Sequence, residues 1–537
     1  MHRRLIDPRL FLSVGLVALT ACSSQPTPPP TAPTAGTQTG AAATTTAQAA
    51  PTTVPLATAP ATEAASPPAS APAASPVAVE PSGKVVYAFH AELSPAWLDP
   101  QENPQLLTPY ATQLAIHDAM VKALPGRPFA PSLAESYEIA PDFTRATFTI
   151  RANAKFHNGD PVTSEDVKFT FENYRGTNAK TLHDMTDRIE TPDARTVTFV
   201  FKKPFLDFLV LYGSMATGAG WIVPKAYYQQ VGPDGFKRAP IGAGPYKFVS
   251  FANGELTLEA MPDYWRKTPA VKTLVIRGVA EEATRVAQLQ TNEADLITLV
   301  PGTLVESVRQ NPQLTFVALK DGSQWLEFPG YEKPENPFNK KEVRQAVDLI
   351  LDRQAINEAE TAGLSPLTSN WIPDDWPGAI ITPPQEYNPA KAKQLMAQAG
   401  YPDGFDAGHI TPLPPFFSLA ERVSTGMRQL GIRTTLQQMD RGAFITKLGQ
   451  GPGAFQGVLL QAVGSPGDAA SRIQAFATCQ GVNSRTCDPY IDETYQKYQA
   501  SIDPQEREKL IGDIQRYMID NYIFLNIYRV AFLVAHG

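Results

Sequence analysis

The chain of 537 residues is poor in charge and in cysteine, and it has no long hydrophobic segment beyond its N-terminus. Charged residues make up 18% of it, with 46 Lys and Arg against 53 Asp and Glu, and the formal net charge is −7. Nucleic-acid binding needs a basic surface that neutralises phosphates, so this acidic balance argues against a nucleic-acid partner. No later segment has the roughly 18 consecutive apolar residues of a transmembrane helix, and we expect none in the body of the chain.

Motifs that would indicate an enzyme are also absent. The 7 histidines form no His-Glu-x-x-His pair and no spacing typical of metal ligands. No Gly-x-Ser-x-Gly sequence is present, so a hydrolase of that class has no nucleophile. The glycines of Ile241–Pro245 end at a proline where a phosphate loop would begin a helix, and we expect a tight turn there. The sequence therefore predicts no catalytic residues, no metal ligands and no cofactor.

The N-terminus has the features of an export signal. Three arginines lie within the first nine residues, and a nearly uninterrupted apolar run follows over residues 10–19. The sequence Leu19-Thr20-Ala21-Cys22 then resembles a bacterial lipobox, in which the cysteine becomes lipid-modified and begins the mature protein. We therefore expect a signal peptide at residues 1–21 and lipidation of Cys22. The alternative is a plain signal peptide with a chance cysteine.

Residues 22–80 are expected to form a disordered tether. From residue 23 onward this segment has only two charged side chains, Glu63 and Glu80, and twelve prolines among Ala, Thr and Ser. So few apolar side chains cannot offset the conformational entropy that is lost on ordering. The protein is thus expected outside the cytoplasm, held by lipid at the outer face of the cell membrane or in the periplasm.

Cys479 and Cys487 enclose seven residues near the C-terminus. In an oxidising compartment, such a pair predicts a disulfide that closes a small loop. Two free thiols are the alternative, and no second cysteine pair is present to make a zinc site.

The folded body alternates strand and helix patterns. Residues 146–151 and 195–201 alternate in hydrophobicity and are predicted strands. Thr163, with an acid at the third helical position, predicts a capped helix, and Asn339 and Asp503 are predicted to begin two others. This alternation is typical of an α/β protein with at least two lobes.

A series of short motifs follows a fixed order along nearly the whole body, from about residue 85 to 530. They are PSLAES at 131–136, FTIR at 148–151, KFHNGDP at 155–161, TSEDVKF at 163–169, GAGPY at 242–246, NPF at 336–338, EVRQAV at 342–347, YNPAKAKQL at 387–395 and DPQER at 503–507. Together they resemble the oligopeptide/dipeptide/nickel class of bacterial ABC-transporter solute-binding proteins, often called family 5.

The resemblance implies an α/β protein of periplasmic-binding-protein type, with two lobes, hinge crossover strands and an enlarged first lobe. The first lobe is expected at residues 81–320 plus 525–537, and the second at 321–524. The segments 315–319 and 524–530 are the expected crossing strands. The two lobes are expected to close on a ligand by a hinge motion.

The resemblance also implies a function and partners. The chain is expected to capture peptides and deliver them to an ABC import permease whose ATPase subunits are separate chains. It would act as a monomer that binds and catalyses nothing. The alternatives are the same fold with a non-peptide solute (a nickel chelate, an opine or a sugar) and a sensor lipoprotein without transport.

In peptide-binding members of this family, an Asp in a Gly/Asp-rich loop pairs with the α-ammonium group of the ligand. The corresponding loop here implies that role for Asp468. Ser465 stands where such members have a first acidic residue, and alanines at 469 and 470 replace a Pro-Asp pair, which weakens the peptide interpretation specifically. The alternative is that Asp468 caps a helix beginning at Ala469.

Aromatic side chains are expected to form the remaining walls of the pocket, because a pocket that tolerates many side chains needs broad apolar surfaces. The candidates lie in predicted loops or crossing segments, and they are Trp97, Tyr110, Trp221, Trp325 and Trp371. For each of them, burial in a hydrophobic core is the alternative.

Overall fold

The computed structural model describes residues 80–537 apart from 103–106, 125–126, 214–217, 452 and 464–466. The predicted signal peptide at 1–21, the predicted tether up to residue 79 and the lipidation site Cys22 lie outside the described residues. Ser465 and the side chain of Tyr110 lie outside them too. In the described part, no helix is long and apolar enough to span a bilayer.

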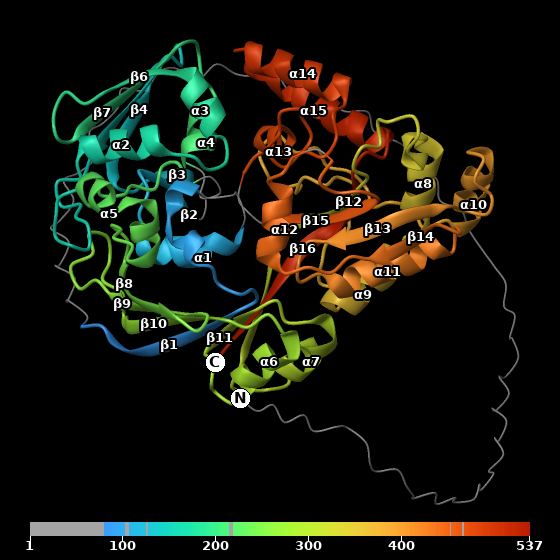
Figure 1. Ribbon diagram of the computed structural model, residues 1–537, viewed down its shortest axis with the longest axis horizontal. Helices are drawn as coiled ribbons and strands as arrows, with labels where there is room; N and C mark the ends of the chain where they lie inside the picture. The colour runs from blue at the N-terminus through green and yellow to red at the C-terminus, as the bar shows by residue number, and fades with distance from the viewer. Residues whose placement is uncertain (1–79, 103–106, 125–126, 214–217, 452, 464–466) are drawn as a thin grey trace, which may run out of the picture. The chain divides into compact units, whose positions relative to one another are not determined.

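One ten-stranded sheet extends through the described body (Figure 1). Its strands are β1 (Ser82–Phe89), β8 (Tyr246–Ala252), β9 (Glu255–Ala260), β10 (Val271–Gly278), β11 (Leu296–Thr298), β12 (Thr315–Glu327), β13 (Asp406–Pro412), β14 (Arg433–Leu436), β15 (Val458–Val463) and β16 (Leu525–His536). They are arranged in the order β14-β13-β15-β12-β16-β11-β1-β10-β9-β8. Both parallel and antiparallel pairs occur, since β1 runs parallel to β10 and β16 runs antiparallel to β12.

Two smaller antiparallel sheets lie between β1 and β8 in sequence. A two-stranded sheet joins β2 (Val121–Leu124) and β3 (Arg127–Pro131), and a four-stranded sheet has the order β4-β5-β7-β6. The strands of the second sheet are β4 (Ala134–Ile139), β5 (Arg145–Ile150), β6 (Thr186–Glu190) and β7 (Thr196–Phe201). β5 and β7 correspond, to within one residue at each end, to the two strands predicted from alternating hydrophobicity, and they pair directly.

Helices follow most strands, as in other α/β proteins. They are α1 (Leu107–Ile116), α2 (Ser164–Asn173), α3 (Ala179–Met185), α4 (Phe208–Gly213), α5 (Lys225–Arg238), α6 (Glu282–Gln290), α7 (Val305–Arg309), α8 (Lys341–Ile350), α9 (Arg353–Thr361), α10 (Pro389–Gln398), α11 (Phe417–Arg428), α12 (Arg441–Leu448), α13 (Ala469–Phe476), α14 (Pro489–Ala500) and α15 (Pro504–Asp520). Short 3-10 helices occur at Pro95–Leu98, Pro100–Glu102, Gly302–Leu304 and Pro337–Asn339. The α/β class predicted from the sequence is confirmed.

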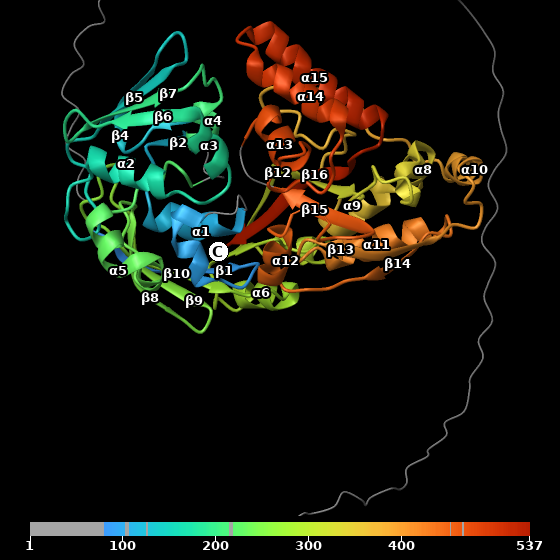
Figure 2. The same cartoon turned by 45° about the horizontal axis from the view of Figure 1, so that its top comes forward.

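Apolar side chains form separate cores in two groups of elements, which we call lobes. The first lobe contains β1–β11 and α1–α7, and its largest core surrounds Phe148 and Phe199. The second lobe contains β13–β15 and α8–α15, and its core includes Trp325, Val347 and Phe524. Figures 1 and 2 both show these groups, blue to green and yellow to red, with β12 and β16 running between them.

β12 and β16 connect the two lobes. They pair antiparallel from Thr315 opposite His536 to Leu326 opposite Leu525. At one end β16 also pairs with β11 of the first lobe, and at the other end β12 pairs with β15 of the second lobe. The two segments predicted to cross between the lobes are therefore neighbouring strands, longer than the sequence pattern indicated.

Two of the three predicted helix starts are correct. Thr163 and Asp166 form a reciprocal capping box at α2, and Asp503 accepts a hydrogen bond from the amide of Gln505 at the start of α15. The prediction for Asn339 is wrong, because Lys340 is the N-cap of α8. The Asn339 side chain instead donates a hydrogen bond of 3.1 Å to the Tyr331 carbonyl, so its amide fixes the preceding turn.

A buried ion pair joins α8 and α9. The Arg353 guanidinium lies 2.5 Å from Asp348 Oδ1, and both side chains are almost fully buried. Arg353 also donates to the backbone carbonyls of Asp348 and of Asn526 on β16. This arginine therefore fixes the two helices against one of the crossing strands.

Cys479 and Cys487 form a disulfide in the second lobe. The loop that it closes contains Arg485, which is almost completely buried. Arg485 donates hydrogen bonds to the carbonyls of Ser484 and of Leu448 at the end of α12. The disulfide loop is thus packed into the lobe rather than lying free on its surface.

Candidate functional site

Asp468 is the N-cap of α13 in the second lobe. Its Oδ1 accepts a hydrogen bond of 2.8 Å from the Ser471 amide, and Ser471 Oγ accepts one of 3.2 Å from the Asp468 amide. Asp468 therefore caps the helix, as the alternative interpretation of this residue states. Among the described residues, the hydrogen bonds to this carboxyl come from Ser471.

Burial and nearby positive charges act in opposite directions on the Asp468 carboxyl. Burial raises the pKa of its carboxyl above the ordinary value, although the Ser471 hydrogen bonds and the charges of Arg507 and Arg472 act in the opposite direction. Burial also raises the pKa of Asp207 in the first lobe, and the nearby charge of Asp468 adds to that shift. The charge of Asp468 therefore acts on Asp207, and the positive charge of Arg507 favours the charged form of both carboxyls.

Asp207 also connects the lobes directly. It lies at the start of α4, and its Oδ1 is 2.5 Å from Nη2 of Arg507 on α15. The Tyr498 hydroxyl on α14 donates to the same oxygen at 2.9 Å. A third contact joins Nε2 of Gln474 on α13 to Oγ1 of Thr181 on α3, at 3.3 Å. The structure therefore has its two lobes in contact at the helices next to Asp468.

The sequence motifs indicated only one half of this contact. Arg507 belongs to the DPQER motif, but Asp207 is separated from it by 300 positions, and nothing in its local sequence identifies a partner. The exposed fractions of the two side chains are 21% for Asp207 and 10% for Arg507. An ion pair with so little solvent exposure is weakened less by salt than a surface pair.

Trp325 and Trp371 lie together in the core of the second lobe. Trp325 is fully buried and Trp371 is 3% exposed. Their ring centres are 5.3 Å apart, and both rings pack against Phe476 and Phe524. Neither indole nitrogen has a hydrogen-bond partner in the described structure. The two tryptophans thus contribute chiefly to packing of this lobe.

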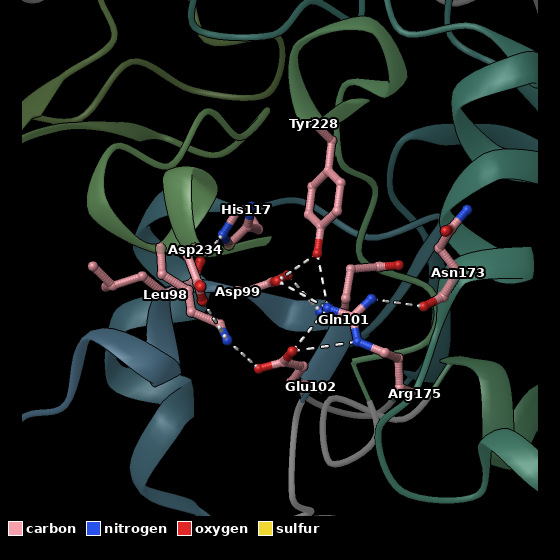
Figure 3. Close-up of polar contacts among 10 residues, drawn as sticks. Leu98, Asp99, Gln101, Glu102, His117, Asn173, Arg175, Tyr228 and Asp234 are labelled. Carbon is pink, nitrogen blue, oxygen red and sulfur yellow. Dashed lines mark hydrogen bonds and ion pairs between the residues drawn. The ribbon is translucent and has the colours of Figure 1, made fainter. Parts of the chain in front are cut away.

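Trp97 lies in a core of the first lobe and is 6% exposed. The residues after it are fixed by a polar network (Figure 3), in which the Tyr228 hydroxyl donates to Asp99 Oδ2 at 2.7 Å. Arg175 Nη2 lies 3.6 Å from the same oxygen and 2.8 Å from Glu102 Oε1. This network anchors the segment that leads from β1 toward α1.

Trp221 is buried in the first lobe, 1% exposed, and forms a β-bridge with Ala119. The Lys122 ammonium lies 5.5 Å from the centre of its ring. Lys122 itself is buried and forms an ion pair of 2.5 Å with Asp118. Trp221 therefore covers a buried ion pair of the first lobe.

The glycine run at Ile241–Pro245 packs closely against the backbone at the end of α1. A Cβ atom on Gly242 would lie 2.0 Å from the Ile116 carbonyl oxygen, and one on Gly244 would lie 2.6 Å from the Ile116 carbonyl carbon. The His157 amide donates to the Gly242 carbonyl at 2.9 Å. Close backbone approach to α1 explains these glycines, and the predicted turn leads directly into β8.

In the part of the chain that the structure describes, no group of three or more His, Cys, Asp and Glu residues could hold a metal ion.

The chain matches the model for the bacterial extracellular solute-binding proteins, family 5, over residues 128–484. It is 27% identical over 481 residues to the di/tripeptide-binding protein 2 of Pseudomonas aeruginosa, an alignment that covers 79% of this chain and 86% of that protein. These relatives are binding proteins rather than enzymes.

Solved structures agree on the fold. The binding protein AgaA from Agrobacterium, in complex with agropinic acid, has a TM-score of 0.72 and 25% identity, over 84% of this chain and 93% of that one. A dipeptide-binding protein from Pseudoalteromonas, in complex with Met-Leu, has a TM-score of 0.74 and 20% identity, over 85% and 96%. The two-lobed architecture of periplasmic binding proteins is thereby confirmed. The chain belongs to family 5 of the bacterial extracellular solute-binding proteins.

Proposed function

We propose that the chain is an extracytoplasmic lipoprotein that captures peptides between its two lobes and delivers them to an ABC import permease with separate ATPase subunits. The observation that carries this proposal is the half-buried Asp468 carboxyl, which caps α13 beside the contact between the lobes, in a chain of this family. The printed name of the Pseudomonas relative adds support for peptides as the ligand class. The chain would act as a monomer, attached to the membrane by lipid at Cys22.

Hinge closure is part of the proposal. We assign residues 81–320 and 525–537 to the first lobe and 321–524 to the second, with β12 and β16 as the hinge. The ion pair between Asp207 and Arg507 supports this assignment, because it joins residues that would separate when the lobes open. The structure would then correspond to a closed state.

A non-peptide solute is the second candidate. Ser465 replaces an acidic residue of the peptide-binding pattern, and the Agrobacterium protein was solved with agropinic acid. A non-peptide solute that carries a positively charged nitrogen could pair with the Asp468 carboxylate in the same way.

Native mass spectrometry of the protein, purified without unfolding, tests the ligand class. A series of bound masses spaced like amino-acid residues would support peptide capture. One discrete non-peptide mass would support the second candidate, a non-peptide solute, as the ligand. Detectable cleavage of peptides by the purified protein would contradict a pure binding function.

Asp468→Asn is expected to weaken binding of trialanine by about 30-fold or more, while binding of N-acetylated trialanine changes little. The reason is that the amide keeps the helix cap but cannot neutralise an ammonium group, and an unpaired buried charge costs about 2–5 kcal/mol. Isothermal titration calorimetry with both peptides measures the difference.

Asp352→Asn is the matched control, because Asp352 caps α9 through the Ala355 amide in the same way. It should leave both affinities unchanged. Equal loss of both peptides in Asp468→Asn would show that this carboxylate does not bind the ammonium group.

Asp207→Asn is expected to weaken ligand binding by about 5- to 30-fold without unfolding the protein. The change replaces the charged acceptor of the hydrogen bond from Arg507 with a neutral amide. Hydrogen bonds to charged groups contribute about 1.5–3 kcal/mol to stability, and part of this contribution to the closed state would be lost. Arg507 keeps its hydrogen bonds to the Tyr498 and Ser501 carbonyls, so α14 and α15 should stay packed. Titration with trialanine gives the affinity, and small-angle scattering gives the fraction of closed molecules.

Asp184→Asn, which removes an exposed ion pair with Lys180 in the same lobe, is the control. Unchanged affinity and unchanged scattering for Asp207→Asn would show that this ion pair does not stabilise closure.

A further inference from the structure

Glu327, the last residue of β12, is a buried carboxyl with few partners. Its side chain is 0% exposed. Oε1 accepts a hydrogen bond of 2.7 Å from Nε2 of Gln461 on β15. Oε2 is also buried, and in the described structure it has no hydrogen-bond partner. A carboxylate in such surroundings loses its hydration without full replacement, so the uncharged acid is favoured there.

The charge of Glu327 therefore changes near neutral pH. Burial raises the pKa of its carboxyl to about 7, although the hydrogen bond from Gln461 and the positive charge of Arg485 act in the opposite direction. Arg485 belongs to the loop that the disulfide closes, and its guanidinium donates to the backbone carbonyls of Ser484 and Leu448. Ionised Glu327 thus keeps a single hydrogen bond among the described residues, the one from Gln461.

Glu327 lies where β12 meets the strand that leads to α13. β12 pairs with β15, and Glu327 is opposite Leu459 in this pairing. β15 continues to Val463, five positions before Asp468, the N-cap of α13. Gln461 lies on β15 between these points, so its hydrogen bond to Glu327 fixes the strand just before α13.

The disulfide loop gives a second connection to α13. The Gly330 amide, three residues after Glu327, donates to the Arg485 carbonyl at 3.2 Å. In the same loop, the Asn483 amide donates to the Ala475 carbonyl of α13 at 2.8 Å. The segment that contains Glu327 is thus bonded both to the strand before α13 and to the loop after it.

We propose that Glu327 is a positioning residue for ligand capture, and that its proton controls how firmly α13 and its N-cap Asp468 are held. With the proton bound, the neutral carboxyl keeps its hydrogen bond to Gln461 inside the core. Once ionised, the carboxylate draws water toward it, and β12, β15 and the disulfide loop pack less tightly. Ligand binding should therefore weaken as the pH rises through neutrality. This inference deepens the proposed function and rests on it.

A stability measurement on the full chain tests Glu327 without any ligand. A carboxyl whose pKa is raised on folding stabilises the fold at low pH, and this contribution is lost as the pH rises through the folded value. Between pH 5 and pH 8, the melting temperature of the wild type should fall by about 3–8 °C relative to that of Glu327→Gln, whose neutral amide resembles the protonated acid. Parallel curves for these two proteins would overturn the proposal.

Glu508→Gln is the matched control, because it removes the same charge at an exposed position of α15 in the same lobe. Its melting temperature should follow that of the wild type at both pH values.

A binding measurement with trialanine tests the positioning role. The affinity of Glu327→Gln divided by that of the wild type should rise by about 4-fold between pH 5.5 and pH 7.5, because most Glu327 carboxyls lose their proton over this range. The titration of the peptide cancels in this ratio, since both proteins bind the same probe. Glu508→Gln should give a ratio that does not change with pH. A constant ratio for Glu327→Gln would overturn the positioning role.

Gln461→Met is a second variant with a different expected result. It removes the hydrogen bond that lowers the pKa of Glu327, so the affinity for trialanine should be lost at a higher pH than in the wild type. An unchanged pH profile would overturn the proposal. Failure of the wild type to bind trialanine at pH 5.5 would instead contradict peptide capture, and the melting temperatures would still decide whether Glu327 controls the packing of the lobe.

Discussion

Arg353→Met is expected to destabilise the second lobe by about 3–5 kcal/mol. The substitution leaves the buried carboxylate of Asp348 without its counter-ion, and breaking one side of a buried pair costs about this much. It also removes the donor to the Asn526 carbonyl on β16. Urea denaturation followed by circular dichroism measures the loss as a lower midpoint.

The loss should depend on pH in a defined direction. Burial already raises the pKa of Asp348, and Arg353 opposes this shift, so the variant raises the pKa of this carboxyl further. A carboxyl whose pKa is higher in the folded state than in the unfolded state favours folding at low pH, and that contribution is lost as the pH rises through the folded value. The difference in the free energy of unfolding between Arg353→Met and the wild type should therefore be smaller at pH 5 than at pH 8.

The double variant Asp348→Leu with Arg353→Met is the control, because it removes both charges. It should recover most of the lost stability, since a buried ion pair can often be replaced by apolar side chains at little cost. If Arg353→Met were as stable as the wild type at pH 8, the ion pair between Asp348 and Arg353 would contribute nothing to the stability of the lobe.

Trp325→Ala is expected to cost about 3–5 kcal/mol of stability, because truncation of a fully buried tryptophan leaves a large cavity. Three aromatic neighbours, Trp371, Phe476 and Phe524, would lose packing at once. Thermal and urea unfolding both report the change, and trialanine titration at low temperature reports binding by the folded fraction.

Tyr490→Ala is the matched control, since Tyr490 is an aromatic residue of the same lobe that is 42% exposed. Its stability should stay within about 0.5 kcal/mol of the wild type. If Trp325→Ala kept its stability but lost affinity, Trp325 would be a wall of the pocket, as the sequence first suggested.

Local sequence signals predicted local structure well. Thr163 with Asp166, and Asp503, cap helices because capping needs only a side-chain oxygen within the first turn. The alternation at residues 146–151 predicted a strand for the same reason, since a period of two follows from the pleat itself. The prediction that Asn339 caps a helix failed because its side chain donates a hydrogen bond to the carbonyl of the earlier residue Tyr331 and none to the first turn of α8.

The candidate site depended on contacts that are distant in sequence. Trp97, Trp221, Trp325 and Trp371 look alike in sequence, and only tertiary packing shows how deeply each is buried. The Asp207–Arg507 contact joins positions 300 residues apart, so nothing in the local sequence of either residue identifies its partner. Charge pairing across two lobes has no local period or spacing that a single sequence could reveal.

The position of β16 has a consequence for how the chain is assembled during synthesis. This last strand is inserted between β11 and β12, in the interior of the sheet, and its Ala531, Leu533 and Ala535 complete a core of the first lobe. The N-terminal elements are synthesised first, so β11 is made long before β16, the strand that pairs with it. The ten-stranded sheet therefore has a gap between β11 and β12 until β16 is made, and its centre is completed after the strands on either side.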